Sequence, residues 1–116
     1  VSGAIIVSTP QDVALIDARK GIDMFSQLKV PILGMIENMS AHVCPKCGHE
    51  EHIFGNGGVR SEAKKIGVPL LAEIPLDLDI RVASDEGAPL VISSPDSMQA
   101  SVFFELAKAM IERGQA

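Results

Sequence analysis

The sequence predicts an α/β domain built around a parallel β-sheet. Three short apolar runs, at residues 3–9, 30–37 and 68–74, have the length and continuity of strands that are covered on both faces. Segments with apolar residues at helical spacing separate these runs, and such alternation favours parallel strands joined by right-handed crossovers. At 116 residues, of which 47% are hydrophobic, the chain is one domain or less and has enough apolar residues for a core.

The first helix is expected directly after the first strand. Thr9 can cap it, Pro10 suits its first position, and Asp12 places negative charge in its first turn. Its apolar stripe comprises Leu15, Ala18, Ile22 and Phe25. The strand at 30–37 follows, with Pro31 near its start, where a missing N–H costs least.

Residues 38–57 form a long connection, and a loop of this length between compact elements is more often functional than not. It contains both cysteines, all three histidines and a glycine-rich cluster at 55–58. A short helix follows, with Val59, Ala63 and Ile66 on its apolar face, and Gly67 is well placed to end it.

After the strand at 68–74 the pattern predicts two more helices and one more strand. A short helix is expected at 77–86, ended by Gly87, and a fourth short strand at 90–92. Ser94 and Pro95 open the last helix. Its apolar stripe comprises Ala100, Phe103, Phe104, Ala107 and Ile111.

Charge and composition exclude several classes of partner. The net charge of −5 and the pI near 5.0 argue against nucleic acid, because a phosphate-tracking protein needs a basic face. Trp and Tyr are absent, so base-stacking platforms are not expected. No run approaches the roughly 20 apolar residues of a membrane span. Two closely spaced cysteines without a secretory signal favour a reducing cytoplasm.

The only two cysteines, Cys44 and Cys47, lie in a C-P-K-C-G motif at residues 44–48. The two-residue gap lets both sulfurs face one point, with Pro45 stiffening the turn and Gly48 relieving crowding, as in metal-binding knuckles. A tetrahedral zinc or an iron–sulfur cluster normally takes four ligands, and this motif supplies two. The pair is therefore half of a site that a second copy completes, a redox pair, a zinc site completed by histidines, or two inert thiols.

His42, His49 and His52 flank the cysteine pair. A Cys₂His₂ zinc site within one chain would use Cys44, Cys47, His49 and His52, although ligand pairs that share one tetrahedron usually come from two separate elements. The redox interpretation needs the first cysteine at a helix N-terminus, where the dipole lowers its pKa, and helix signals resume only well after the motif.

Ligands of a parallel α/β sheet bind outside the carboxyl ends of its strands, which directs attention to residues 8–10, 37–39 and 75–77. Asn38 offers an amide donor and an acceptor, which suits the edge of a nucleobase, although asparagine is also a common turn residue. Asp77 and Asp79 are more simply interpreted as the acidic first turn of a helix.

Spaced motifs run in register over nearly the whole chain, to about residue 110. They are S-T-P-Q-D-V-A-L at 8–15, E-N-M-S at 37–40, C-P-K-C-G at 44–48, I-F-G at 53–55, G-V-P-L-L at 67–71, I-P-L-D at 74–77 and I-R-V-A-S-D at 80–85. Together they resemble the Mrp family of P-loop ATPases, the ApbC-like iron–sulfur cluster carrier and scaffold proteins.

The resemblance implies a three-layer P-loop NTPase domain of the deviant-Walker type, of which residues 1–116 are the C-terminal half. It implies a homodimer in which Cys44 and Cys47 of each subunit supply two thiolates to one bridging [4Fe–4S] cluster, which is then passed to apo iron–sulfur proteins. It also implies that Asn38 contacts an adenine base and that Pro75 and Asp77 help to wall that base.

In this resemblance the family's glycine-rich P-loop and its acidic metal-binding strand end fall before residue 1. We therefore expect the full-length protein to bind and slowly hydrolyse ATP with Mg²⁺, and this chain alone not to be catalytic. A cytoplasmic protein is expected, with an organellar relative as the alternative. The rival functions are a zinc-binding structural module that uses Cys44, Cys47 and nearby histidines, and a thiol–disulfide enzyme.

Overall fold

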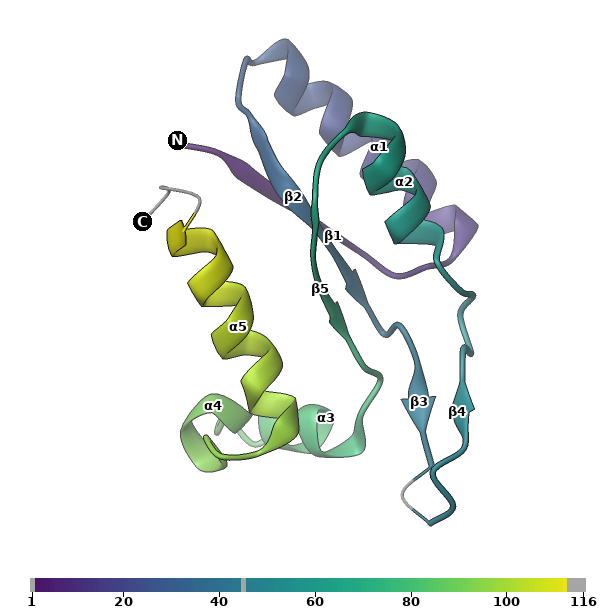
Figure 1. The fold of residues 1–116 in the computed structure, drawn as a ribbon, viewed down its shortest axis with the longest axis vertical. Coiled ribbons are helices and arrows are strands. Elements are labelled where there is room, and N and C mark those ends of the chain that lie inside the picture. The colour runs from purple at the N-terminus through teal and green to yellow at the C-terminus, as the bar shows by residue number, and fades with distance from the viewer. Residues whose placement is uncertain (1, 45, 113–116) are drawn as a thin grey trace.

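Three parallel strands form the central sheet of this computed structural model, which describes residues 2–44 and 46–112. Their order is β1 (Ala4–Ser8), β2 (Ile32–Asn38) and β5 (Leu70–Ile74), so β2 is the middle strand. Figure 1 shows α1 (Asp12–Gln27) and α2 (Gly58–Ile66) on one face of the sheet and α5 (Met98–Glu112) on the other. The predicted three-layer α/β domain with a parallel sheet is confirmed.

The core lies between the sheet and the layer of α1 and α2. Met35, on the middle strand, is 0% exposed, and the predicted stripe of α1 is buried at Leu15, Ala18 and Ile22, with Phe25 packed at its margin. The cluster is completed by Ile6, Val59 and Ala63. Ile6 of β1 and Met35 of β2 therefore meet the apolar stripe of α1 that the sequence pattern predicted.

The ends of the early helices follow the sequence signals only in part. Helix α1 begins at Asp12 with Gln11 in the capping position, and no side chain caps it. Thr9, the predicted cap, instead donates a hydrogen bond from Oγ1 to Gln11 Oε1 over 3.0 Å. Helix α2 ends as predicted at Gly67, whose φ of 77° is a left-handed conformation that glycine adopts at little cost.

Residues 90–92 form no strand, and this prediction was wrong. They lie in the short helix α4 (Leu90–Ser93), which follows α3 (Leu78–Asp85). The backbone N–H of Ser93 donates to Pro89 O over 3.0 Å and that of Ser94 to Leu90 O over 2.8 Å, the helical pattern. A short apolar run fits either state, and no strand of the described residues lies beside it to pair with, so local hydrogen bonds decide the outcome.

Helix α5 buries less of its apolar stripe than the sequence predicted. Ala100 is fully buried and Phe103 is partly buried, but Phe104 is 50% and Ile111 62% exposed. The helix packs mainly against β5, at one edge of the sheet, and against α4. An edge strand covers a narrower part of a helix than a full sheet does, so the outer apolar residues of α5 remain exposed.

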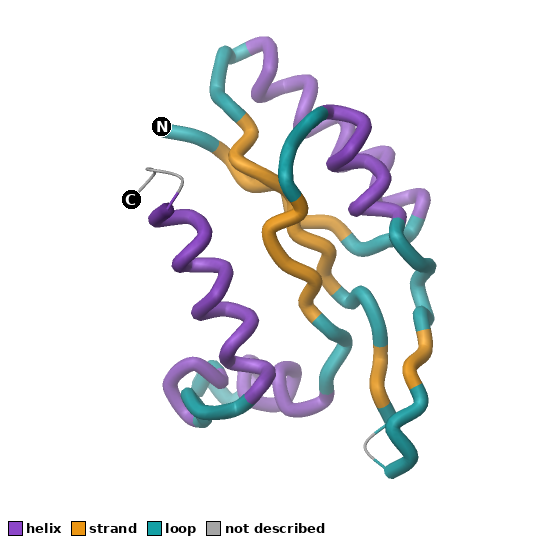
Figure 2. The backbone as a smooth tube through the Cα atoms, viewed as in Figure 1, coloured by secondary structure: helices purple, strands orange, loops and turns teal. Residues whose placement is uncertain are grey.

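The long connection at 38–57 contains a short antiparallel hairpin that the sequence did not predict. Its strands are β3 (His42–Val43) and β4 (Glu50–Glu51), with His42 opposite Glu51 and Val43 opposite Glu50. Figures 1 and 2 show the hairpin extending beyond the carboxyl end of the sheet, away from α1 and α2. The connection is therefore an ordered projection that carries both cysteines.

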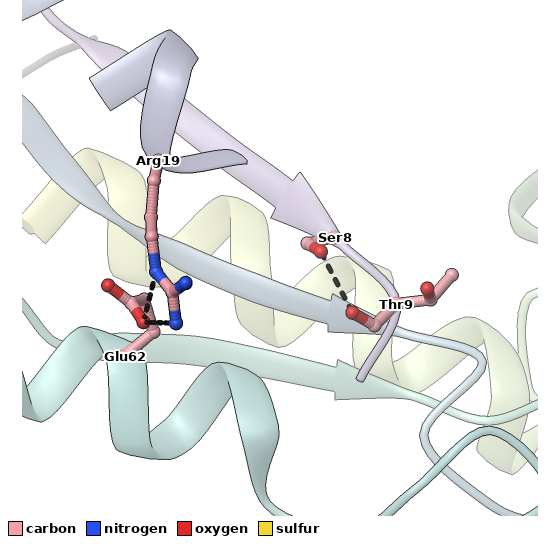
Figure 3. A network of polar contacts seen from close by, with 4 residues as sticks. All are labelled: Ser8, Thr9, Arg19 and Glu62. Atoms are coloured by element: carbon pink, nitrogen blue, oxygen red, sulfur yellow. Dashed lines mark hydrogen bonds and ion pairs between the residues drawn. The ribbon is translucent and has the colours of Figure 1, made fainter. Parts of the chain in front are cut away.

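An ion pair joins the two helices that cover the core. Arg19 on α1 reaches across to Glu62 on α2, where Nε and Nη2 donate to Oε1 over 2.9 and 2.8 Å (Figure 3). The side chain of Glu62 is only 7% exposed, whereas that of Arg19 is 49% exposed. The hydrogen bond from Arg19 lowers the pKa of the Glu62 carboxyl below its ordinary value, and burial opposes this shift.

We expect the Arg19–Glu62 pair to make folding sensitive to acid. Because the pKa of Glu62 is lower in the folded state, the pair stabilises the fold above the unfolded pKa of about 4.3, and that stability is lost as pH falls through the folded pKa. Glu62→Gln should reduce stability at pH 7 and flatten the acid limb of a urea-unfolding series. The exposed control Glu105→Gln should leave that limb unchanged, and equal slopes in both variants would contradict the assignment.

Candidate functional site: the cysteine hairpin and the strand ends

The β3–β4 hairpin places Cys44 and Cys47 at its tip. Cys44 follows directly on β3, and its N–H donates to His49 O over 2.8 Å, which continues the strand pairing by one step. Gly48 N–H then donates to Cys44 O over 2.9 Å, and the φ of Gly48 is 72°. Gly48 therefore turns the chain in a left-handed conformation, a role beyond the relief of crowding that the sequence predicted, while Pro45 lies outside the described residues.

Both cysteines are free thiols that solvent can reach. Cys44 is half-buried and Cys47 is exposed. The pKa of Cys44 is lowered, first by a hydrogen bond from the backbone N–H of Cys47, then by that of Lys46, against a smaller opposing effect of burial and of the Glu51 charge. Backbone N–H groups that converge on a sulfur stabilise its thiolate, which is the form that binds metal.

The histidines beside the cysteines are turned to other partners. His52 Nδ1–H donates to Ser40 O over 3.1 Å, and its Nε2 lies 3.2 Å from Glu50 Oε1. His49 Nε2 lies 3.4 Å from Glu51 Oε1. Across residues 2–44 and 46–112, no three His, Cys, Asp or Glu side chains are gathered as a metal site. The Cys₂His₂ set considered for zinc is thus not assembled within one described chain.

Two backbone hydrogen bonds fix the base of the hairpin to the end of β5. Ser40 N–H donates to Ile74 O over 3.0 Å, and Leu76 N–H donates to Ala41 O over 2.8 Å. The segment that follows β5 therefore contacts the first residues of the hairpin. The orientation of the cysteine loop depends on these bonds, because the rest of the hairpin extends beyond the sheet (Figure 1).

Asn38 and Pro75, both predicted at a base site, lie at neighbouring strand ends. Asn38 is the last residue of β2 and stands opposite Ile74, so Pro75 follows one residue further along the adjacent strand. The side-chain oxygen of Asn38 accepts a hydrogen bond from Met39 N–H over 3.0 Å. Among the described residues no hydrogen bond uses its amide N–H₂ group, so that group and the second lone pair of the oxygen can both meet a ligand.

Asp77 has a structural role that the sequence analysis identified. Its Oδ1 accepts from Ile80 N–H over 3.1 Å, which caps α3, and its Oδ2 accepts from Gln99 Nε2 over 3.2 Å. Both carboxylate oxygens are thus used by the protein. The interpretation of Asp77 as the acidic start of a helix is confirmed, with the added finding that it ties α3 to α5.

A cavity of about 680 Å³ lies between β3, the segment after β5 and the first turn of α5. Its lining residues are His42, Val43, Pro75, Leu76, Asp77, Leu78, Asp79, Ser97, Met98, Gln99 and Val102. Pro75 and Asp77 therefore share one cavity, whereas Asn38 lies beside it and not in its wall. Sequence reasoning missed the wall from α5, because no local pattern relates residues 97–102 to residues 75–79.

Glu37, which the sequence analysis included among the strand-end residues at 37–39 without giving it a role, is buried. It is 3% exposed on the middle strand, and its Oε1 has no hydrogen-bond partner among the described residues. Strand alternation places it on the face of Met35, toward α1 and α2, and so opposite to Asn38. The signal was present as a lone charge in the apolar run at 30–37.

Comparison with known proteins shows which family the chain belongs to. Residues 1–111 match the family model of ParA, described as NUBPL iron-transfer P-loop NTPase. The chain belongs to this family. It is 53% identical over 97% of its length to the "Iron-sulfur protein required for NADH dehydrogenase, mitochondrial" of Arabidopsis thaliana, and 50% identical over 92% to the "Iron-sulfur cluster carrier protein" of Pseudomonas fragi.

A similar fold is also found among solved structures. A nucleotide-binding protein of Archaeoglobus fulgidus, solved in complex with ADP, superimposes with a TM-score of 0.69 at 36% identity, covering 83% of this chain and 38% of that one. The chain spans 36% and 37% of the length of the two relatives above. Among the helices described here, none is long and apolar enough to cross a membrane.

Proposed function

We propose that the protein is an iron–sulfur cluster carrier in which Cys44 and Cys47 of two subunits hold one bridging [4Fe–4S] cluster. The observation that carries this proposal is the pair of free thiols at the exposed tip of a hairpin. Each chain brings two thiolates and the described residues gather no third ligand around them, so a second copy is the simplest source of the other two.

The chemistry of the hairpin tip suits a cluster that is held only until it is transferred to another protein. A carrier must hold iron through thiolates and yet let an acceptor protein reach the same atoms. The lowered pKa of Cys44 favours the thiolate, and the N–H groups of Lys46 and Cys47 that lower it would also stabilise a sulfur bound to iron. The exposure of Cys47 leaves a path for exchange of ligands with an incoming thiolate.

The part of the proposal that concerns nucleotide binding applies to the full-length protein and not to this chain alone. We propose that ATP and Mg²⁺ bind there, with the base contacted by Asn38 and walled by Pro75 and Asp77. Asp77 would serve as a fixed wall, because its carboxylate is already hydrogen-bonded within the protein. The support is the cavity beside Pro75 and the ADP complex of the Archaeoglobus relative.

The partners and the compartment are proposals of the same kind. The recipients would be apo iron–sulfur proteins, in keeping with the names of the relatives. The assembly would be a homodimer joined at the hairpin tips. We place the protein in the cytoplasm, with an organelle as the alternative because one relative is named mitochondrial.

Anaerobic reconstitution with iron and sulfide tests the proposal. A four-iron cluster shared by two chains requires about two irons per chain, visible charge-transfer absorbance, and a dimer in size-exclusion chromatography with in-line light scattering. A colourless monomer that binds one zinc per chain, as a structural zinc site would, overturns the proposal in favour of the zinc module. A Cys44–Cys47 disulfide that forms with oxidised glutathione and is reversed by dithiothreitol, in a chain that binds no iron, would favour the thiol–disulfide enzyme.

A further inference from the structure

The turn between β2 and the hairpin contains a residue in an unfavourable backbone conformation. Met39 has a φ of 54°, in the left-handed region that residues with a side chain rarely adopt. Only one other non-glycine residue of the described chain, Lys29, has a positive φ. Such strain persists where surrounding interactions hold it, and Met39 stands between the last residue of the sheet and the first anchor of the cysteine hairpin.

The side chain of Asn38 contacts the peptide bond that leads into Met39 and so orients the plane of that peptide. Asn38 Oδ1 accepts from Met39 N–H over 3.0 Å, a short-range bond that competes with continuation of the strand. The next residue, Ser40, then donates to Ile74 O and accepts from His52 Nδ1–H. The side-chain oxygen of Asn38 therefore sets the direction in which the chain leaves the sheet and begins the hairpin.

We propose that Asn38 is a positioning residue for the cysteine hairpin, acting through Met39. Its single side-chain oxygen holds the turn when no ligand is bound. A nucleobase amine that donates to the same oxygen would compete with Met39 N–H and so loosen the turn. Base contact at Asn38 and the placement of Cys44 and Cys47 are in this way linked through one atom. The link to the base rests on the function proposed above, whereas the positioning role does not.

The backbone hydrogen bonds at the ends of β2 and β5 support the link between base contact at Asn38 and the placement of the cysteine hairpin. The bonds that fix the hairpin base, from Ser40 to Ile74 O and from Leu76 to Ala41 O, run to the residues on either side of Pro75. Pro75 and Leu76 line the cavity of about 680 Å³. A ligand between Asn38 and Pro75 would therefore touch both supports of the hairpin at once.

Amide hydrogen exchange in the full 116-residue chain, without nucleotide, tests the positioning role. Asn38→Ala should raise exchange at Ser40 and Leu76 about fivefold, as loss of one hydrogen bond of ordinary strength predicts, while core amides such as that of Ala18 stay unchanged. Asn38→Asp keeps an acceptor oxygen and should retain protection. Asn56→Ala, the same chemical change at an exposed bend, is the matched control.

A double variant keeps the test decisive if Asn38→Ala loosens the chain for another reason. Adding Met39→Gly to Asn38→Ala should restore protection at Ser40, because glycine adopts the positive φ of this turn without strain and the turn then needs less support from the Asn38 side chain. Unchanged exchange in Asn38→Ala, an equal rise in Asn56→Ala, or no restoration by Met39→Gly would each overturn the positioning role.

Titration of the wild-type chain with adenosine monophosphate tests the link to the base. Shifts of the Asn38 side-chain amide together with faster exchange at Ser40 and Leu76 would support it. Shifts at Asn38 with unchanged exchange would overturn the link and leave the base site standing. Absence of any shift at Asn38 would remove both the base contact and the link, while the nucleotide-free variants still decide the positioning role.

Discussion

Replacing either cysteine by serine is expected to abolish cluster binding while the domain remains folded. A serine hydroxyl stays protonated at neutral pH and cannot replace a thiolate on iron. In a dimer of Cys44→Ser or Cys47→Ser chains only two of the four thiolates remain, so bound iron after reconstitution should fall to background. The unfolding free energy should change by about 0.5 kcal/mol or less, since both residues lie at the tip of an exposed hairpin.

The same hairpin offers a matched control in His49→Ala. The side chain of His49 is 65% exposed and lies beside Glu51, so its removal should leave the iron content at the wild-type level. Loss of metal in His49→Ala, or full iron occupancy in either serine variant, would contradict the assignment of the ligands. The first result would revive the zinc module, in which a histidine completes the set.

Truncation of Met35 is expected to cause the largest loss of stability. Met35 is 0% exposed in the core between the sheet and the layer of α1 and α2. Met35→Ala should lower the free energy of unfolding by about 2–5 kcal/mol, from the lost burial and the cavity left behind. That is a large part of the roughly 5–15 kcal/mol that holds a domain folded. Because β2 also carries Asn38, a loosened strand should weaken the hairpin base as well.

Met24→Ala is the control for this loss, because it makes the same chemical change on α1 at a site that is 50% exposed. Its expected cost is below about 1 kcal/mol. Urea-unfolding midpoints of the two variants, with equal m-values, measure the difference directly. Similar midpoints would mean that Met35 does not lie in the core as described.

The order of elements was predictable because each strand and helix carries its own pattern. Continuous apolar runs mark β1, β2 and β5, and glycine at position 67 marks the end of α2. The run at 90–92 misled the analysis, since three apolar residues fit a strand or a helical turn equally well. Its state depends on whether a neighbouring strand exists, which is a property of the assembled sheet.

The candidate site, like the fold, has features that the sequence predicted and features that it did not. The C-x-x-C spacing singled out the cysteine pair that we propose as the metal ligands, because the chemistry of two thiolates at one point is local. The hairpin that presents this pair was not predictable, since β3 and β4 have two residues each and their pairing gives no periodic signal. The wall that α5 contributes to the cavity, and the hydrogen bond from His52 to Ser40 O, also arise from residues distant in sequence.

The sequence by itself determined the α/β class, the parallel strands and the family, and it predicted which two sulfur atoms we propose as ligands. These follow from short-range spacing and residue chemistry, which survive without any knowledge of neighbours in space. Tertiary structure alone decided that the base of the hairpin is hydrogen-bonded to the end of β5, that Asp77 is committed to α3 and α5, and that the hairpin projects beyond the sheet. The physical reason is that hydrogen-bond partners and burial belong to pairs of segments, and a pair forms only when the chain has folded.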